Sequence, residues 1–225
     1  MLPFPFEILW NKIIGMIKEE LKGYKNRKIE ILLQEYSGKD LVVFYPGAKS
    51  LPTDPLFYWV RNILEINHIS YIFFNFQWDI LRKAKQDPAF DFLSVVSEEI
   101  HISFDYLKYF KHKAISIFSY STGCVANSLV HDGVLGNAYT LKKIFWVEPH
   151  KSIKDVESLN HRKDYVYLCR NSDKFGSDFV FMLNKNTTLR ETYSLWYLLN
   201  KKPQRNSYEK IYPVLKLFKS DFLLK

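Results

Sequence analysis

One short segment near the middle of the chain constrains the fold more than any other. An apolar run at residues 114–118 stops at a turn-forming stretch, residues 119–123, and helix-compatible residues follow. This order predicts a buried strand, a tight turn and a helix. Ser119 and Gly123, two positions before and after Ser121, are small enough to let a strand and a helix approach closely. The segment therefore favours a sheet whose strands are followed by helices.

The same alternation extends over the rest of the chain. Apolar segments typical of buried strands lie at residues 28–36, 41–45, 69–76, 114–118, 143–148, 165–169 and 179–183. Apolar residues at helical spacing predict helices over residues 54–66, 91–110, 125–130, 153–159, 189–199 and 207–218. Apolar strands separated by helices predict an α/β fold, a mostly parallel central sheet with helices on both faces. The turn at 37–40 predicts that the first two strands form a hairpin.

The N-terminal residues carry a separate pattern. Their apolar side chains recur at helical spacing, which predicts an amphipathic helix over about 5–22. Its polar face has charges of both signs, so packing on the domain is favoured over binding to a membrane surface or a partner. We predict a single domain over residues 1–225, with this helix inside 1–24 and a C-terminal tail at 203–225.

Composition indicates one globular domain. Of the 225 residues, 47% are hydrophobic and 17% are aromatic, which is enough for a sizeable core. The two cysteines, Cys124 and Cys169, lack metal-type spacing, so we expect a reduced, cytoplasmic protein without a disulfide framework. The first residues have no positively charged leader, and no apolar run reaches ~18 residues, so neither an export signal nor a transmembrane segment is expected.

The net charge of +8 is spread along the whole chain and is not gathered in one run. A basic surface can favour nucleic acid or anionic lipid, and such binding would weaken steeply with salt. No zinc-finger spacing, recognition-helix pattern or aromatic RNA-binding motif accompanies the charge. We therefore expect no nucleic-acid partner, and a basic surface that binds nucleic acid or membrane is the weakest of three interpretations.

The turn around Ser121 resembles the nucleophile elbow of the α/β-hydrolase superfamily. That elbow holds a serine in a strained conformation between a strand and a helix. Here Gly123 occupies the second small position of the motif, and Ser119 replaces the glycine that is usual at the first. The order of elements is similar to that family over residues 28–200, which implies the α/β-hydrolase fold with Ser121 as nucleophile. The insert at 149–164 is short, which implies little or no cap.

The resemblance also implies further site residues. Ligands of parallel α/β sheets bind at the carboxyl ends of the strands. The family's oxyanion hole uses the amide after the nucleophile, here Thr122, and an amide after an earlier strand, here Ala48. The family's acid follows a later strand, which matches Asp173, with Glu148 as the alternative acid position. An aspartate in such a loop can equally be a turn or capping residue.

The catalytic base is the point at which the sequence departs from the family. α/β-Hydrolases carry a histidine after the last strand, but no histidine follows His161 in this chain. A serine hydroxyl needs a group that accepts its proton during attack. Three explanations are open. His150 supplies the base from a neighbouring strand end, another group such as Lys185 in the loop at 184–188 does so, or the protein is inactive.

Two functions from different classes follow. The first is a serine hydrolase that acts on an ester or thioester, with a small-molecule acyl substrate and no metal or cofactor. The second is a catalytically inactive binding or scaffold protein with the α/β-hydrolase fold. Aromatic residues near the predicted site suit either an acyl-binding surface or a core, and these are Phe57, Tyr58, Trp59, Trp78 and Tyr120. The substrate, the pathway and the oligomeric state have no signature in the sequence.

Overall fold

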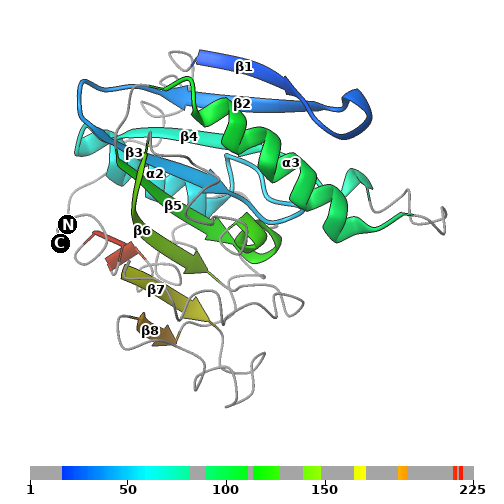
Figure 1. Ribbon diagram of the computed structural model, residues 1–225. Coiled ribbons are helices and arrows are strands. Elements are labelled where there is room, and N and C mark those ends of the chain that lie inside the picture. The colour runs from blue at the N-terminus through cyan, green and yellow to red at the C-terminus, as the bar shows by residue number, and fades with distance from the viewer. Residues whose placement is uncertain are drawn as a thin grey trace.

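The central element of the protein is an eight-stranded sheet with the order β1-β2-β4-β3-β5-β6-β7-β8 (Figure 1). The structure, a computed structural model, describes residues 17–81, 90–110, 114–126, 139–147, 165–170, 187–191, 215–216 and 218–219. The strands are β1 (Ile17–Lys22), β2 (Lys28–Gln34), β3 (Asp40–Tyr45), β4 (Ser70–Asn75), β5 (Ala114–Tyr120), β6 (Thr140–Val147), β7 (Tyr165–Arg170) and β8 (Thr187–Glu191). The helical elements are η2 (Tyr24–Asn26), α2 (Pro55–Ile66), α3 (Phe92–Leu107) and η4 (Ser121–Cys124).

Most of the sheet is parallel. β1 pairs antiparallel with β2, and β2 pairs antiparallel with β4. Every further neighbouring pair, from β4 and β3 to β7 and β8, is parallel. The carboxyl ends of these parallel strands therefore meet at one edge. The predicted fold class, a mostly parallel sheet with helices on both faces, is confirmed.

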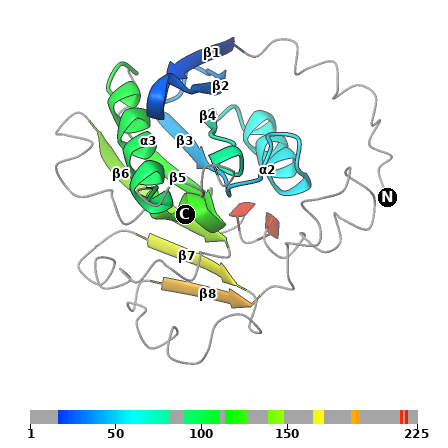
Figure 2. The same cartoon turned by 90° about the vertical axis from the view of Figure 1, so that its right-hand side faces the viewer.

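Helices α2 and α3 cover opposite faces of the sheet (Figure 2). Along β3, Leu41 and Val43 belong to the core beneath α3, whereas Val42 and Phe44 belong to the core beneath α2. This alternation follows from the two-residue period of a strand. Because both sets are apolar, β3 is buried on both faces, as the continuous apolar run predicts. The predicted helices over 54–66 and 91–110 are confirmed.

The predicted hairpin between residues 28–36 and 41–45 is wrong. β2 pairs with β1 and β4, and β4 separates it from β3. An apolar strand has the same pattern whichever strand it pairs with, so the sequence could not identify the partner. The hairpin that does open the sheet joins β1 to β2 through η2.

The predicted N-terminal helix is also wrong over residues 17–22, which form β1. Ile17 pairs with Leu33 and Leu21 with Ile29. An interval of four residues places two side chains on one face of a helix and equally on one face of a strand. The spacing of the apolar residues therefore could not distinguish a helix from a strand over residues 17–22. Residues 5–16 of the predicted helix lie outside the described residues.

The C-terminal part of the chain requires one more correction. Residues 187–191 form β8, where the sequence predicts the end of a loop and the start of a helix. The β-branched pair Thr187 and Thr188 favours a strand, and β8 pairs parallel with β7. In the sequence, Lys185 therefore precedes β8 and does not follow the last strand that the structure describes. The predicted strand at 179–183 and helix at 153–159 lie outside the described residues.

A C-terminal segment contributes to the core beneath α2. Leu215 and Phe218 are buried there, and residues 215–216 are helical. The ring of Phe218 packs edge-on against Phe118 of β5 and Phe145 of β6, at centroid distances of 5.3 and 5.5 Å. Within the described part of the chain, no helix has the length and apolar character needed to cross a membrane.

Candidate active site

The predicted nucleophile lies at the carboxyl end of β5, the strand between β3 and β6. β5 ends at Tyr120, and Ser121 begins η4. The neighbouring strand β3 ends at Tyr45, three residues before Ala48. The fold therefore brings Ser121 and the two predicted oxyanion-hole residues, Thr122 and Ala48, to adjacent strand ends.

The predicted acids and base are Asp173, Glu148 and His150, and all three lie outside the described residues. β6 ends at Val147, so Glu148 and His150 follow its carboxyl end in the sequence. β7 ends at Arg170, three residues before Asp173. Their assignment to this edge stays a prediction.

The backbone at Ser121 adopts a rare conformation. Its φ of 50° lies in the left-handed region, whereas Tyr120 is extended, with φ −133° and ψ 134°. A non-glycine residue in a sparsely populated region of this kind costs about 1–3 kcal/mol and persists where the surroundings fix it. Ser121 is also partly exposed, while Tyr120 and Thr122 on either side are buried. The sharp turn therefore directs one polar residue out of a buried segment.

Gly123 shows what fixes the turn. A Cβ atom at this position would lie 2.5 Å from the carbonyl oxygen of Pro46 and from the carbonyl carbon of Tyr45, and closer still to the carbonyl oxygen of Tyr45. Only glycine permits so close an approach of η4 to the end of β3. The turn after β5 and the loop after β3 are thus in direct backbone contact.

The loop after β3 also packs against Tyr120, the residue before Ser121. A Cβ atom at Gly47 would lie 2.9 Å from the ring of Tyr120. The Gly47 carbonyl accepts a hydrogen bond from the Ser50 amide at 3.0 Å. Because the peptide bond is planar and trans, the Ala48 N–H points away from that carbonyl. Among the described residues it donates to no backbone carbonyl.

A small buried polar cluster joins the turn to β6. Ser119 is fully buried, and its hydroxyl donates to the Phe145 carbonyl at 3.4 Å. Cys124 is equally buried, and its thiol donates to the Val147 carbonyl at 3.8 Å. Burial raises the pKa of the Cys124 thiol to about 12, so this cysteine stays a protonated packing residue. Ser119 is therefore accommodated at the position where the family has glycine.

Most of the aromatic residues near the predicted site belong to the core. Phe57 and Trp78 are fully buried, and Tyr58 and Tyr120 nearly so. Trp59 is only partly buried. Of the two interpretations that the sequence left open for these residues, the core is the one that the structure supports.

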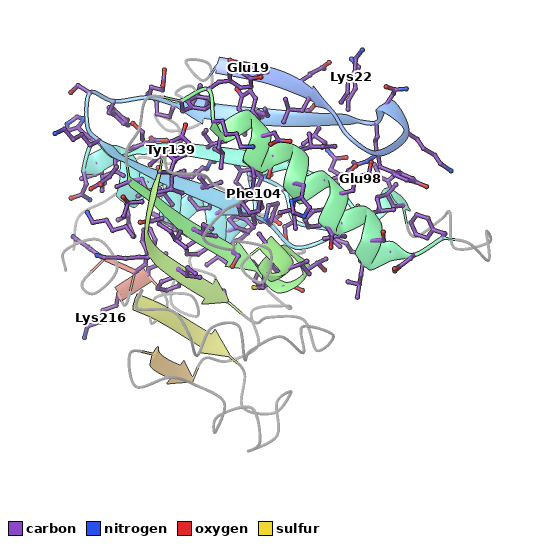
Figure 3. The ribbon with its side chains drawn as sticks, in the orientation of Figure 1. Glu19, Lys22, Glu98, Phe104, Tyr139 and Lys216 are labelled. Carbon is purple, nitrogen blue, oxygen red and sulfur yellow. The ribbon has the colours of Figure 1, made fainter. Side chains whose placement is uncertain are left out.

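Two of the six histidines lie within the described residues. His68 lies two residues before the start of β4, at the edge of the sheet opposite to Ser121. His101 is exposed on α3, where its ring packs edge-on against Phe104, which is buried between α3 and the sheet (Figure 3). Neither histidine directly follows the carboxyl end of a parallel strand. The role of His150 as the base therefore stays a prediction.

Sequence reasoning missed the contact that holds Ala48. The amide of Asp79, in the loop after β4, donates to the Ala48 carbonyl at 2.8 Å. A backbone donor has no signature in the side-chain pattern, so only the strand order β4-β3-β5 could have placed these two loops side by side.

Comparisons with solved structures identify the fold. A dienelactone hydrolase from Anabaena variabilis superposes with a TM-score of 0.65 and 14% sequence identity, over 92% of this chain and 97% of that one. An α/β serine hydrolase homologue from Coxiella burnetii gives a TM-score of 0.62 at 9% identity, over 90% of this chain and 95% of that one. An α/β serine hydrolase without a lid from Xanthomonas campestris gives 0.57 at 11% identity, over 97% and 95%.

The protein therefore has the α/β-hydrolase fold, as the residues around Ser121 predict. No protein-family model and no curated protein sequence matches the chain. At these sequence identities the likeness extends to the fold alone.

Proposed function

We propose that this protein is a serine hydrolase that cleaves an ester or thioester with Ser121 as nucleophile. The observation that carries the proposal is the left-handed backbone at Ser121, held at the end of β5 by the contact of Gly123 with the end of β3. This conformation presents the hydroxyl at the edge of the sheet where ligands of α/β folds bind.

The proposed reaction has two stages, acylation of Ser121 and hydrolysis of the acyl-enzyme. The Ser121 hydroxyl oxygen attacks the acyl carbonyl carbon, and His150 accepts the hydroxyl proton. The resulting oxyanion is bound by the amides of Ala48 and Thr122. Collapse of this intermediate breaks the bond to the alcohol or thiol, which takes the proton from the imidazolium. Water then attacks the acyl-enzyme in the same way and releases the acid.

The two amides are suited to this role for different reasons. Thr122 lies in the first turn of η4, where backbone N–H groups have no acceptor within the helix. The Ser50 amide fixes the direction of the Gly47 carbonyl, and the Ala48 N–H of the same trans peptide points the opposite way. Two such donors aimed at one oxygen each stabilise the transition state by about 3 kcal/mol.

Loss of the hydroxyl tests the proposal. Ser121→Ala should abolish turnover of p-nitrophenyl acetate and of a thioester analogue, with the thermal unfolding temperature nearly unchanged. Ser116→Ala is the matched control, because Ser116 is a buried serine on the same strand but lies away from its carboxyl end. Equal turnover in wild type and Ser121→Ala would refute the proposal.

The base and the acid need separate tests. His150→Asn should lower kcat by at least ~10²-fold, whereas His161→Asn, in the same part of the sequence, should not. Asp173→Asn and Glu148→Gln distinguish the two acid positions, because only the residue that orients the imidazole should lower kcat strongly. If neither His150→Asn nor the acid variants lower kcat, another group removes the proton.

One observation favours a second function. No histidine follows β8 in the sequence, which is where the family carries its base. A protein that kept the fold without a base would bind an acyl compound and not turn it over. Saturable binding of a non-hydrolysable ester analogue without turnover of the matching ester would identify this case.

We also propose a cytoplasmic location, which the cysteines support. Cys124 is free and buried in the core beneath α3. A reduced thiol in a core is ordinary for a protein in a reducing compartment.

A further inference from the structure

A buried carboxylate on α3 links three segments that are distant in the sequence. Glu99 is fully buried, and it accepts from the indole N–H of Trp78 at 2.7 Å and from the Tyr24 amide at 3.1 Å. Arg27 donates to it through Nε at 3.1 Å and also through Nη2. Its neighbour Glu98 is exposed (Figure 3). The Glu99 charge is therefore paired, and each of its oxygens accepts two hydrogen bonds, as a buried carboxylate requires.

The ion pair of Arg27 and Glu99 forms hydrogen bonds with both ends of the segment 76–78, which follows β4. Arg27 Nη1 donates to the carbonyl oxygen of Phe76, and Glu99 accepts from the side chain of Trp78. The rings of Phe76 and Trp78 are fully buried and stack at a centroid distance of 4.4 Å. Gln77 between them has a φ of 48°. A strained residue of this kind persists only where its neighbours are fixed, and here both are.

The next residue, Asp79, contacts Ala48 of the proposed oxyanion hole. The Asp79 amide, in the same peptide plane as the Trp78 carbonyl, donates to the Ala48 carbonyl at 2.8 Å. A displacement of Trp78 therefore moves the donor that holds Ala48. The Trp78 carbonyl is itself fixed by a bond from the Leu81 amide at 3.1 Å, so the whole turn moves as one unit.

We propose that Glu99 and Trp78 are positioning residues for the oxyanion hole. The inference rests on the proposed function, in which the Ala48 amide binds the oxyanion. Arg27 fixes Glu99, Glu99 fixes Trp78, and Trp78 places the Asp79 amide that holds Ala48. An oxyanion-hole donor acts on the transition state more than on the bound substrate, so loss of its position lowers kcat and leaves KM nearly unchanged.

Trp78→Phe is the variant that isolates this connection. It keeps an aromatic ring for the stack on Phe76 and keeps the ion pair of Arg27 and Glu99, but it removes the indole N–H. Ser103→Ala is the matched control. Ser103 is buried one helical turn further along α3, and its hydroxyl is 2.9 Å from that of Tyr45, so this variant also removes a buried bond between α3 and the sheet.

Amide hydrogen exchange measures the positioning without any reference to catalysis. In Trp78→Phe, exchange in segments 46–54 and 76–81 should be faster by about tenfold, and in Ser103→Ala it should be unchanged there. In Arg27→Lys, exchange in the same two segments should be accelerated to a smaller extent, because lysine keeps the charge but loses the bond to Phe76. Unchanged exchange in Trp78→Phe, or equal acceleration in Ser103→Ala, would overturn the inference.

Kinetics give the second readout. Trp78→Phe should lower kcat for p-nitrophenyl acetate by about tenfold with KM within a factor of about two, while Ser103→Ala keeps the wild-type kcat. Wild-type kcat in folded Trp78→Phe would contradict the positioning role. If turnover does not depend on Ser121 at all, the proposed function fails, and the exchange measurement still decides whether Trp78 holds the Ala48 loop.

Discussion

The two faces of the sheet differ in the contacts that reach its carboxyl edge. Beneath α2 the core is mainly aromatic, and the ring of Phe44 lies within 6.0 Å of those of Phe57, Tyr71, Phe73 and Phe118. Beneath α3 the helix is also tied to the sheet and its loops by directional bonds, those of Glu99 with Trp78 and of Ser103 with Tyr45. Glu65 of α2 also accepts a hydrogen bond from the Tyr71 hydroxyl at 2.6 Å, but Tyr71 lies near the amino end of β4, away from the carboxyl edge. Of the Glu99 and Ser103 bonds on the α3 face, only that of Glu99 with Trp78 leads to a loop at the carboxyl edge, so we expect this bond, and not that of Ser103, to influence the site.

The largest expected effect lies at the turn after β5. In Gly123→Ala the new methyl group would collide with the backbone of Tyr45 and Pro46. Turnover should fall by at least ~10²-fold and the free energy of unfolding by about 1–3 kcal/mol, because η4 must move away from β3. Gly38→Ala is the control, since its methyl group would come no closer than 4.0 Å to the His68 carbonyl oxygen. Similar activity in the two variants would contradict this account of the turn.

On the α3 face, the charge of Glu99 should matter far more than that of its neighbour. Glu99→Gln leaves Arg27 without its buried partner, so the free energy of unfolding should fall by about 3 kcal/mol. Glu98→Gln, on the exposed side of the same helix, should change it by less than about 0.5 kcal/mol. Chemical denaturation of the two variants gives this comparison directly. Equal stabilities would mean that the ion pair contributes nothing to the fold.

On the α2 face, loss of an aromatic ring should affect stability and not geometry. Phe44→Leu removes part of a ring cluster that is fully buried, and should cost about 1–2 kcal/mol. Turnover per folded molecule should stay at the wild-type level, and hydrogen exchange in 76–81 should not change. A loss of kcat as large as that of Trp78→Phe would remove the distinction between the two faces.

The smallest effect concerns Asp54, a polar exception on the α2 side. Asp54 precedes α2 and accepts from the Leu51 amide at 2.8 Å, and burial raises the pKa of its carboxyl to about 6. Because this pKa exceeds the ordinary value of 3.8, the folded state binds the proton more tightly than the unfolded state. Stability should therefore fall as the pH rises from 4 to 6, by about 1 kcal/mol, because solvent screens part of the shift.

Asp54→Asn keeps an acceptor for Leu51 and removes this titration. Relative to wild type, the variant should gain stability between pH 4.5 and pH 7.5. Denaturation at both pH values measures the difference. An identical pH dependence in wild type and Asp54→Asn would show that Asp54 is not the group responsible.

Much of the fold could be predicted because its central strands are apolar on both faces. β3, β4 and β5 are mostly apolar and end at turn residues, and α2 and α3 have clear helical spacing. β1 and β8 were missed because most of their residues are polar, with Ile17 and Leu21 the apolar residues of β1 and Leu189 that of β8. Strand pairing was missed because the order β2-β4-β3 is a property of the whole sheet and not of any local segment.

In the candidate site, too, one part could be predicted from the sequence and another could not. That Ala48 and Ser121 share one edge follows from parallel strands alone. The connection from Arg27 through Glu99 to Trp78 could not be predicted, because 72 residues separate the two charged side chains. In a sequence, a glutamate on a helix is typical of a solvated face, and only the structure places Glu99 in the core.

The most direct test of the central claim is labelling with a fluorophosphonate probe, followed by identification of the modified peptide. Such a probe reacts with an activated serine and forms a covalent bond to its oxygen. The account predicts labelling of wild type at Ser121, none in Ser121→Ala, and wild-type labelling in Ser116→Ala. Folded wild-type protein that is not labelled, or is labelled at another residue, would contradict it.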